Sequence, residues 1–277
     1  MHFARALETG NVLWQQPDGR FCDLTIALGT LAPTTVYDAV CDEDLHATLA
    51  WLPLREAFCL PASTALACPL PTPNRILAIG RNYADHAKEL GNAIPDEPVV
   101  FQKANSSIIG PNANIVLQSE IGQVDHEGEL LVVIGNGGRD IPRSSAQDHV
   151  VGYSIINDVT ARAKSKALQA KGYPWFLAKC RDTFGPIGPV VVTASSLNDQ
   201  FPLSIDVTVN GELRQHGTTD QMIHDVAALI HFLSTVTELM PGDCIATGTP
   251  SGVGPLLAGD TVAVTISGIG TLTNPVN

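Results

Sequence analysis

The chain has 277 residues, enough for one large domain or for a small domain followed by a larger one. Its 28 acidic and 16 basic residues give a formal net charge of −12, which argues against nucleic acid or an anionic membrane as the main partner. No apolar run approaches the ~20 residues that cross a bilayer, and the N-terminus does not resemble a secretion signal. The six cysteines are scattered without paired spacing, so we expect reduced thiols in a cytoplasmic protein.

Residues 1–72 carry short alternating segments and turn signals, and they lead into a proline-rich joint, CPLPTPNR at 68–75. This pattern predicts a small N-terminal α+β domain over 1–72 and a second domain over 73–277. From Arg75 onward, short β-rich runs alternate with Gly, Pro and Asn. Many short strands at modest spacing predict a mostly β fold with some helix, of the sandwich, roll or barrel type.

Two helices and one hairpin are predicted within the second domain. Apolar residues at helical spacing predict a short helix over 84–90 and a longer one over about 220–239, which Pro241 and Gly242 close. Asn210 and Gly211 predict a two-residue hairpin, because both positions tolerate positive φ.

The stretch HEGELLVVIG at 126–135 places two glutamates at the head of an apolar strand. Glu127 and Glu129 are two residues apart, so their side chains project from the same face of the strand. A solvated strand end explains these two residues equally well. Asp158 ends another apolar run, VVGYSIIND, and three carboxylates at the ends of buried strands favour a hard cation such as Mg²⁺, Mn²⁺ or Ca²⁺.

A second candidate group lies upstream, in AIGRNYADHAKE. His86 and Glu89 are three residues apart on the predicted short helix, so the carboxylate can orient the imidazole and raise its basicity. The alternative is an incidental pair on a surface helix. The preceding strand and glycine favour a functional role, because helices that follow strand ends commonly border sites.

Two loops supply further candidates. Lys179, in PWFLAKCRDTFGPIGP, lies where an ammonium can hold a carboxylate or an enolate oxygen, although an exposed loop lysine is an equal alternative. The segment PGDCIATGTPSGVG at 241–254 is a strand followed by a loop rich in Gly, Thr and Ser. Its amides and the hydroxyl of Thr249 can bind an anion, or the segment is simply a tight loop.

Taken in order, GRNYADHAKE, HEGELLVVIG, GYSIINDVTAR, FLAKCRDTFGPIGP, VNGELRQHGTT and PGDCIATGTPSGVG resemble the fumarylacetoacetate hydrolase family over roughly 75–276. The resemblance implies a β-roll catalytic domain, a variable smaller N-terminal domain and a homodimer. It also implies that Glu127, Glu129 and Asp158 bind Mg²⁺ or Mn²⁺, with Ca²⁺ as a substitute.

The family's active-site residues map onto His86, Glu89 and Lys179, and we expect substrate contacts from Arg81, Tyr83, Arg162 and Thr249. Two stretches depart from the family pattern. Residues 163–165 read Ala-Lys-Ser where many relatives have an Asp and, two residues on, a Gln that approaches substrate. Residues 180–181 read Cys-Arg where a small residue and Phe are common.

These residues predict a metal-dependent hydrolase that cleaves a C–C bond in a β-diketo acid, with a small keto acid as its partner and neither nucleic acid nor membrane. The alternative within enzymes is a decarboxylase, isomerase or tautomerase of keto-dicarboxylic acids such as oxaloacetate or a 2-hydroxydienedioate, because the same enolate serves all of these reactions. A catalytically silent relative that binds a keto acid is a further alternative, but such a module needs no water-activating pair.

Overall fold

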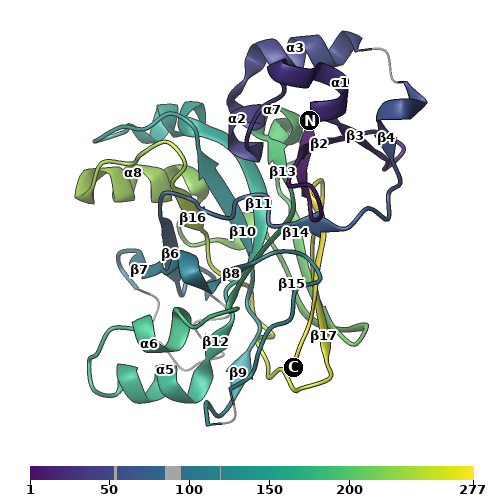
Figure 1. Cartoon of the computed structure of the whole chain (residues 1–277). Helices are drawn as coiled ribbons and strands as arrows, with labels where there is room; N and C mark the ends of the chain where they lie inside the picture. The colour runs from purple at the N-terminus through teal and green to yellow at the C-terminus, as the bar shows by residue number, and fades with distance from the viewer. Residues whose placement is uncertain (53–54, 85–94, 119) are drawn as a thin grey trace.

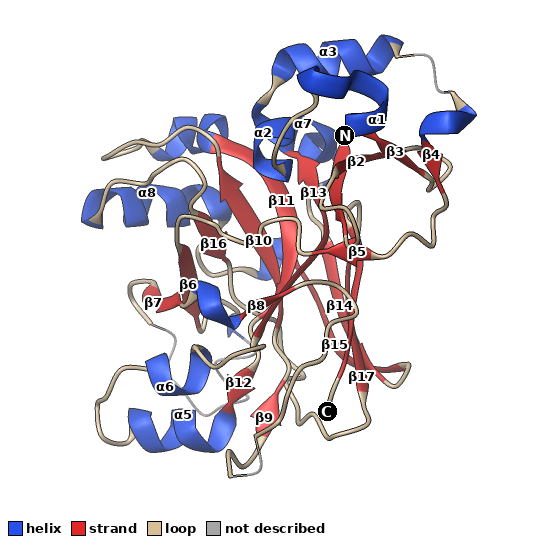
Figure 2. Cartoon of the chain, in the orientation of Figure 1, coloured by secondary structure: helices blue, strands red, loops and turns tan. Residues whose placement is uncertain are grey.

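The computed structural model describes residues 1–52, 55–84, 95–118 and 120–277. The fold is mostly β, as predicted, and it is built around one large sheet (Figure 2). None of the helices in the described part of the chain is both long and apolar enough to cross a membrane. All six cysteines are free thiols.

Within the described residues the large sheet has twelve strands. In spatial order its main path is β4 (Cys59–Leu60), β3 (Phe21–Asp23), β2 (Val12–Gln15), β1 (His2–Ala6), β13 (Gly185–Thr193), β11 (Val150–Asn157), β10 (Gly128–Ile134), β16 (Cys244–Ala246), β6 (Ile76–Gly80) and β7 (Val99–Lys103), with β5 (Leu66–Ala67) paired to β1 and β8 (Ile108–Ile109) paired to β13. A separate two-stranded sheet joins β9 (Val124–Asp125) to β12 (Thr160–Ala161).

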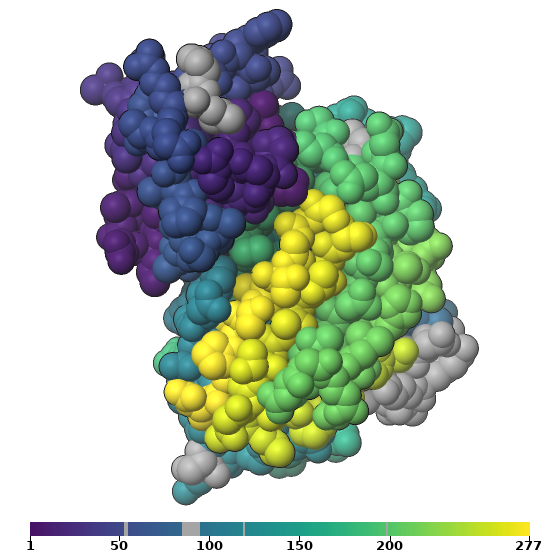
Figure 3. Space-filling view, turned by 90° about the vertical axis from the view of Figure 1, so that its right-hand side faces the viewer, coloured from purple at the N-terminus to yellow at the C-terminus, as the bar shows by residue number. Residues whose placement is uncertain are grey.

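The second sheet covers the middle of the large one. It has the order β15 (Glu212–Thr218), β14 (Ser204–Val209), β17 (Thr261–Ile266) and β18 (Gly270–Pro275). Its strands contact β10, β11 and β13, and the inward-facing apolar residues of both sheets form the main core. In the space-filling view, the C-terminal residues (yellow) lie beside the green segments on this face (Figure 3). Because both faces of β10 are covered, every one of its residues is buried.

The first five strands join the same large sheet, because β1 pairs with both β2 and β13. The N-terminal helices gather at one end of the molecule, close to the N-terminus (Figure 1). A second apolar cluster combines residues from both sides of the predicted boundary, such as Phe3 and Leu49 with Val133 and Val191. The division into 1–72 and 73–277 stays a prediction.

The helices are short and peripheral. Among the described residues they are α1 (Leu24–Leu28), α2 (Val36–Cys41), α3 (Glu43–Trp51), α5 (Arg162–Gln169), α6 (Phe176–Lys179), α7 (Ala194–Leu197) and α8 (Val226–Val236). The 3₁₀ turns are Gly29–Leu31, Glu56–Phe58, Asn105–Ser107, Arg143–His149, Asn198–Gln200 and Thr219–Gln221.

The helix predicted over 220–239 is shorter than expected at both ends. It begins after Asp225, whose carboxylate accepts the N–H of Ala228 and caps the first turn, and it ends at Val236. Residues 219–221 form a separate 3₁₀ turn, and Ile223 donates its N–H to the carbonyl of Asn82 instead of to a helical partner. Tertiary hydrogen bonding therefore replaced the first helical turn that the apolar spacing suggested.

The predicted hairpin is confirmed. Strands β14 and β15 pair in antiparallel fashion, and the two residues between them have φ values of 53° at Asn210 and 80° at Gly211. Of the short helix predicted over 84–90, residues 85–90 lie outside the described part of the chain.

Candidate metal and substrate site

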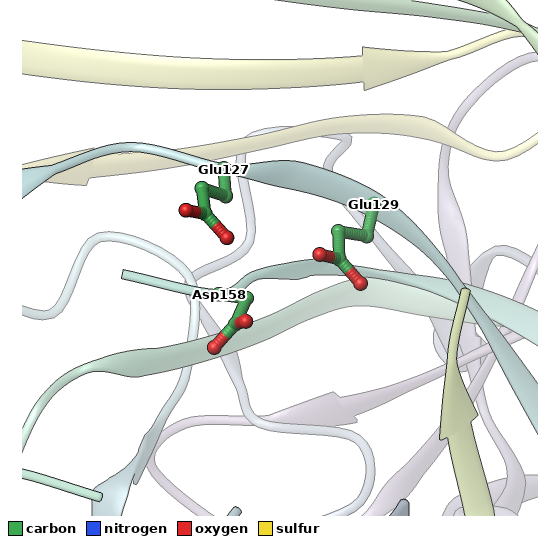
Figure 4. A group of neighbouring side chains, drawn as sticks. All are labelled: Glu127, Glu129 and Asp158. Atoms are coloured by element: carbon green, nitrogen blue, oxygen red, sulfur yellow. The ribbon is translucent and has the colours of Figure 1, made fainter. Parts of the chain in front are cut away.

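The three predicted carboxylates meet at one place. Gly128 of β10 pairs with Asn157 of β11, and Glu129 pairs with Ile156. Asp158 directly follows β11 and donates its N–H to the carbonyl of Glu127 at 2.8 Å, so it lies opposite Glu127. One oxygen from each carboxylate lies within 4.8 Å of the others, and all three residues are buried. Figure 4 shows the three carboxylates turned toward one another. We call these three residues the acidic triad.

Gly128, between the two glutamates, explains part of this spacing. It points to the opposite face of β10, where the second sheet lies directly against the backbone. A Cβ at this position would lie 2.5 Å from a methyl group of Val207 and 2.8 Å from one of Val264. The sequence Glu-Gly-Glu therefore combines two inward carboxylates with the close approach of two sheets.

Two buried lysines neutralise part of the acidic triad. Nζ of Lys179, at the end of α6, donates to Oε2 of Glu127 at 2.7 Å and forms a shorter contact with Oδ2 of Asp158. Nζ of Lys103 lies 2.7 Å from Oδ1 of Asp158, an ion pair outside hydrogen-bond geometry, and donates to the carbonyl of Lys179 at 2.6 Å. Burial opposes the charged form of Lys179, but Asp158, Glu127 and Glu129 outweigh it, so the pKa of Lys179 is raised.

Sequence reasoning missed Lys103, because VVFQK at 99–103 shows no apolar–polar alternation and the phase of the strand appears only in the structure. Strand β7 alternates between half-buried and exposed residues, and the alternation places Lys103 on the same face as Val99 and Phe101. A lysine in phase with inward-facing residues needs a buried anion, and Asp158 supplies it. Asp125 was also missed; it pairs with Arg162, as described next.

Arg162 forms two ion pairs within the protein. Its Nε donates to Oδ2 of Asp125 at 2.7 Å, and its terminal nitrogen pairs with Oε1 of Glu127. Arg162 is buried at the start of α5, and it binds the Glu127 oxygen that Lys179 does not bind. The predicted contact between Arg162 and a substrate carboxylate stays a prediction.

Glu129 is the least neutralised member of the acidic triad. Its Oε2 accepts the backbone N–H of Gly248 at 2.8 Å, and no described residue forms an ion pair with it. Burial raises the pKa of Glu129 well above its usual value, and the charges of Asp158 and Glu127 add to this effect against the opposing charge of Lys179. Within the described part of the chain Glu129 has no ion-pair partner, and with Glu127 and Asp158 it forms an all-oxygen donor set that fits a hard divalent cation.

Two of the predicted substrate contacts, Thr249 and Tyr83, lie on segments beside the acidic triad. Thr249 donates its hydroxyl to the carbonyl of Gly128 at 2.8 Å. Tyr83 has a buried hydroxyl without a hydrogen-bond partner among the described residues, and burial followed by the charge of Glu129 raises its pKa. A cleft of about 230 Å³ is lined by Tyr83, Pro250 and Ser251, together with Ala84, His216 and Gln221.

Arg81 lies farther out. Its guanidinium is 5.9 Å from the ring centroid of Trp175 and donates to Oε1 of Gln169 at 3.2 Å. Residues 180–181 were one of the two stretches that depart from the family pattern, and Arg181 donates there to the carbonyl of Leu177. Nearby, Nζ of Lys179 lies 5.0 Å from the ring centroid of Phe101. His86 and Glu89 lie outside the described residues.

Comparisons with known proteins agree with this geometry. Residues 75–277 match the family model described as fumarylacetoacetate (FAA) hydrolase, C-terminal. Protein Rv2993c of Mycobacterium tuberculosis is 47% identical over 203 residues, which cover 73% of this chain and 75% of that protein. Oxaloacetate tautomerase YisK of Bacillus subtilis is 44% identical over 222 residues, which cover 76% of this chain and 72% of the relative.

Several solved structures cover the whole chain, and two of them show the range of reactions. The 5-carboxymethyl-2-hydroxymuconate delta-isomerase of Mycobacterium smegmatis superposes with a TM-score of 0.77 at 37% identity, over 100% of this chain and 98% of that one. Maleylpyruvate hydrolase from Sphingobium sp. SYK-6, in complex with manganese (II) ion and pyruvate, superposes with a TM-score of 0.81 at 31% identity, over the same shares. Related enzymes therefore differ in reaction, and at least one binds Mn²⁺.

Proposed function

Because the chain belongs to the fumarylacetoacetate hydrolase family, we propose that it is a divalent-metal-dependent hydrolase that cleaves a C–C bond in a β-diketo acid such as an acylpyruvate. The observation that carries this proposal is the buried acidic triad, in which Glu127 and Asp158 share the ammonium of Lys179 while Glu129 has no cationic partner among the described residues. Such a site is stable in the ionised state when a divalent cation completes its charge balance.

We assign Glu127, Glu129 and Asp158 as the ligands of Mg²⁺ or Mn²⁺, with Ca²⁺ as a substitute. The cation supplies Lewis acidity, which polarises the 2-keto group of the substrate and stabilises enolate character. Three protein ligands would leave room on the cation for water and substrate.

His86 and Glu89 are the proposed water-activating pair, and their assignment rests on the sequence. His86 would remove a proton from water, and the resulting hydroxide would attack the distal carbonyl carbon of the acylpyruvate. The bond between that carbon and the adjacent methylene would then break, which releases a carboxylic acid and the enolate of pyruvate. Protonation of the enolate carbon completes pyruvate.

The remaining residues would hold charge and substrate. Lys179 and the Thr249 hydroxyl would stabilise the negative charge that develops on the substrate. Arg81 and Tyr83 would contact the substrate from the segment that leads into residues 85–94. Arg162 would act on the substrate carboxylate only if it exchanges one of its contacts with Asp125 and Glu127.

A second candidate is a keto–enol tautomerase of oxaloacetate or an isomerase of an unsaturated keto-dicarboxylic acid. The observation that favours it is the name of the YisK relative, an oxaloacetate tautomerase at 44% identity. Such a reaction moves a proton through the same enolate and needs no attacking water. Loss of CO₂ from oxaloacetate is a third outcome of the same chemistry.

Product analysis by NMR separates these reactions. The protein would be incubated with Mn²⁺ and, separately, with an acylpyruvate and with oxaloacetate, each beside an EDTA control. Formation of pyruvate and the matching acid, lost with EDTA, is the expected result. Faster enol–keto exchange of oxaloacetate, without cleavage of the acylpyruvate, would replace the hydrolase by the tautomerase, whereas CO₂ release would identify a decarboxylase.

We further propose that the protein works in the cytoplasm as a homodimer in the breakdown of aromatic compounds. Six free thiols are compatible with a reducing compartment. Sedimentation equilibrium tests the dimer, and a monomeric mass would contradict it.

A further inference from the structure

A buried glutamine outside the acidic triad fixes the backbone that carries it. Gln215 lies on β15 and is fully buried. Its side-chain amide oxygen and amide nitrogen each have two polar partners. Its Oε1 accepts the backbone N–H of Gly128 at 3.2 Å and faces Nδ1 of His126 at 2.9 Å. Its Nε2 donates to Oγ1 of Thr249 at 2.8 Å and to the carbonyl of Pro250 at 2.8 Å.

These contacts form a closed ring of hydrogen bonds that includes both backbone groups of Gly128, the residue between the two glutamates. Thr249 donates to the carbonyl of Gly128, while Gln215 accepts from the N–H of Gly128. Gly248, beside Thr249, donates its N–H to Glu129. One side chain therefore ties strand β10, the loop over 247–251 and a carboxylate of the acidic triad into a single hydrogen-bonded unit.

The strand is bent to place this glutamine inside. In the pairing of β14 with β15, Gln215 opposes Val207, but Leu213 opposes Thr208, so Arg214 is an extra residue in a β-bulge. Without the bulge, Leu213 and Gln215 would face the same side. Instead Leu213 is 56% exposed while Gln215 is fully buried.

The bulge itself is held by the loop that follows Thr249. A Cβ at Gly252 would lie 2.0 Å from the carbonyl oxygen of Arg214, so the loop passes directly against the bulge. Leucine is ordinarily buried and glutamine ordinarily exposed, so Leu213 and Gln215 both depart from the usual preference of their residue type. This departure persists where a site requires it.

The amide also determines the tautomer of His126. Because Nε2 of Gln215 is committed to two acceptors, its Oε1 is the acceptor that faces the imidazole, and Nδ1 of His126 must carry the proton. In the neutral imidazole, Nε2 of His126 is then an unprotonated acceptor, and it is buried and without a hydrogen-bond partner among the described residues. His126 directly precedes Glu127, so Gln215 also holds the residue next to the first ligand of the acidic triad.

We propose that Gln215 is a positioning residue that sets the geometry of Glu127 and Glu129 by holding the Gly128 peptide, Thr249 and the Nδ1–H tautomer of His126. The proposal rests on the metal-ligand assignment above but not on the hydrolase reaction. Gln215 acts through the backbone of Gly128 and touches neither the metal nor the substrate.

The test uses the full-length protein and the variant Gln215→Leu, with Gln200→Leu, at an exposed glutamine, as the matched control. Binding of Mn²⁺, followed by electron paramagnetic resonance, is expected to weaken about 10- to 100-fold in Gln215→Leu, as for other residues that orient metal ligands. The control should bind as the wild type does. Unchanged Mn²⁺ affinity and unchanged kcat in a folded Gln215→Leu protein would overturn the proposal.

Two further readouts separate a positioning role from a merely structural one. Nitrogen-15 NMR of the wild type should show protonated Nδ1 at His126, and Gln215→Leu should lose this pattern; protonated Nε2 in the wild type would overturn the proposed hydrogen-bond polarity. If Gln215→Leu does not fold, Thr249→Val breaks the same unit from the opposite side and is expected to weaken Mn²⁺ binding, and unaltered binding would overturn the proposal.

Failure of the proposed reaction gives a different result. A wild type that binds Mn²⁺ but does not cleave acylpyruvates would refute the hydrolase, while the Mn²⁺ and NMR readouts for Gln215 would still apply. A wild type that cleaves acylpyruvates, with Gln215→Leu equal to it in every readout, would refute the positioning role alone.

Discussion

The ammonium of Lys103 lies 2.7 Å from Oδ1 of Asp158, and neither side chain is exposed by more than 1%. Lys103 therefore holds one oxygen of Asp158, while Lys179 holds the other. The ammonium of Lys103 also donates to the backbone carbonyl of Lys179. Two lysines from distant segments, β7 and α6, therefore depend on each other for their position.

Loss of this buried lysine should destabilise the protein. Lys103→Met keeps most of the side-chain volume but leaves Asp158 with one cationic partner fewer, and breaking one side of a buried ion pair costs about 3–5 kcal/mol. Urea denaturation with EDTA present measures the loss in the free energy of unfolding. Lys166→Met, on the exposed face of α5, is the matched control and should change stability little; equal stability of the two variants would contradict the role of Lys103.

Removal of a proposed metal ligand and removal of the proposed base should have different effects on Mn²⁺ binding. Glu127→Ala is expected to abolish both Mn²⁺ binding and turnover, because it deletes a ligand and leaves Lys179 and Arg162 each without one of their partners. His86→Ala should bind Mn²⁺ normally and lose hydrolysis. Calorimetry gives the affinity and NMR gives the products, with exposed Glu56→Ala as the control. Unchanged Mn²⁺ affinity in Glu127→Ala would remove it from the ligand set.

The raised pKa of Glu129 predicts that metal binding depends on pH. A cation binds the ionised carboxylate, so it competes with a proton, and Mn²⁺ affinity should rise with pH until the pH exceeds the raised pKa. The metal-free protein has the opposite dependence. A carboxyl whose pKa is raised on folding contributes stability below its unfolded pKa, and this contribution is lost as pH rises through the folded pKa.

Thermal unfolding with and without Mn²⁺ measures both effects. The gap in Tm between the two series should widen as the pH rises above the usual range of a glutamate and towards the raised pKa of Glu129. In Glu129→Gln, which cannot ionise at this position, the widening should be reduced. A constant gap in the wild type would show that metal binding displaces no proton in this range.

Gly128→Ala should destabilise the packing of the two sheets. The new methyl group would lie 2.5 Å from the side chain of Val207, so the sheets must separate or shift, at a cost of about 1–3 kcal/mol. Gly254→Ala is a suitable comparison, because its Cβ would meet only Nε2 of His126, at 3.6 Å. Chemical denaturation should give Gly128→Ala a clearly lower free energy of unfolding than Gly254→Ala. Similar free energies would mean that the two sheets can separate at little cost.

Thiol reactivity should follow burial. Desolvation raises the pKa of Cys68 to about 12 and that of Cys22 to about 11, and both side chains are buried, as is Cys244. Cys41 is exposed and should react first with a thiol reagent at neutral pH, although burial of its sulfur also raises its pKa. Mass spectrometry of the labelled native protein identifies the sites; early labelling of Cys244 would contradict the buried core around β16.

The sequence alone determined the local parts of this protein. The apolar run over 130–134 predicted a strand, so Glu127 and Glu129 at its head were expected to share a face, because side-chain direction in a strand follows from its period of two. The apolar run ending at Asp158 predicted a third acid at a strand end. Asn210 and Gly211 predicted their hairpin for an equally local reason, the tolerance of positive φ.

Tertiary structure decided the contacts between segments far apart in the chain. Lys103 reaches Asp158 only because β7 joins the sheet beside β6, and Gln215 reaches Gly128 only because a bulge turns it inward over β10. The first turn of the helix predicted from residue 220 was likewise replaced by hydrogen bonds between Asn82 and residues 223–224. These outcomes depend on which surfaces pack together, and the periodicity of a single segment carries no information about its partner.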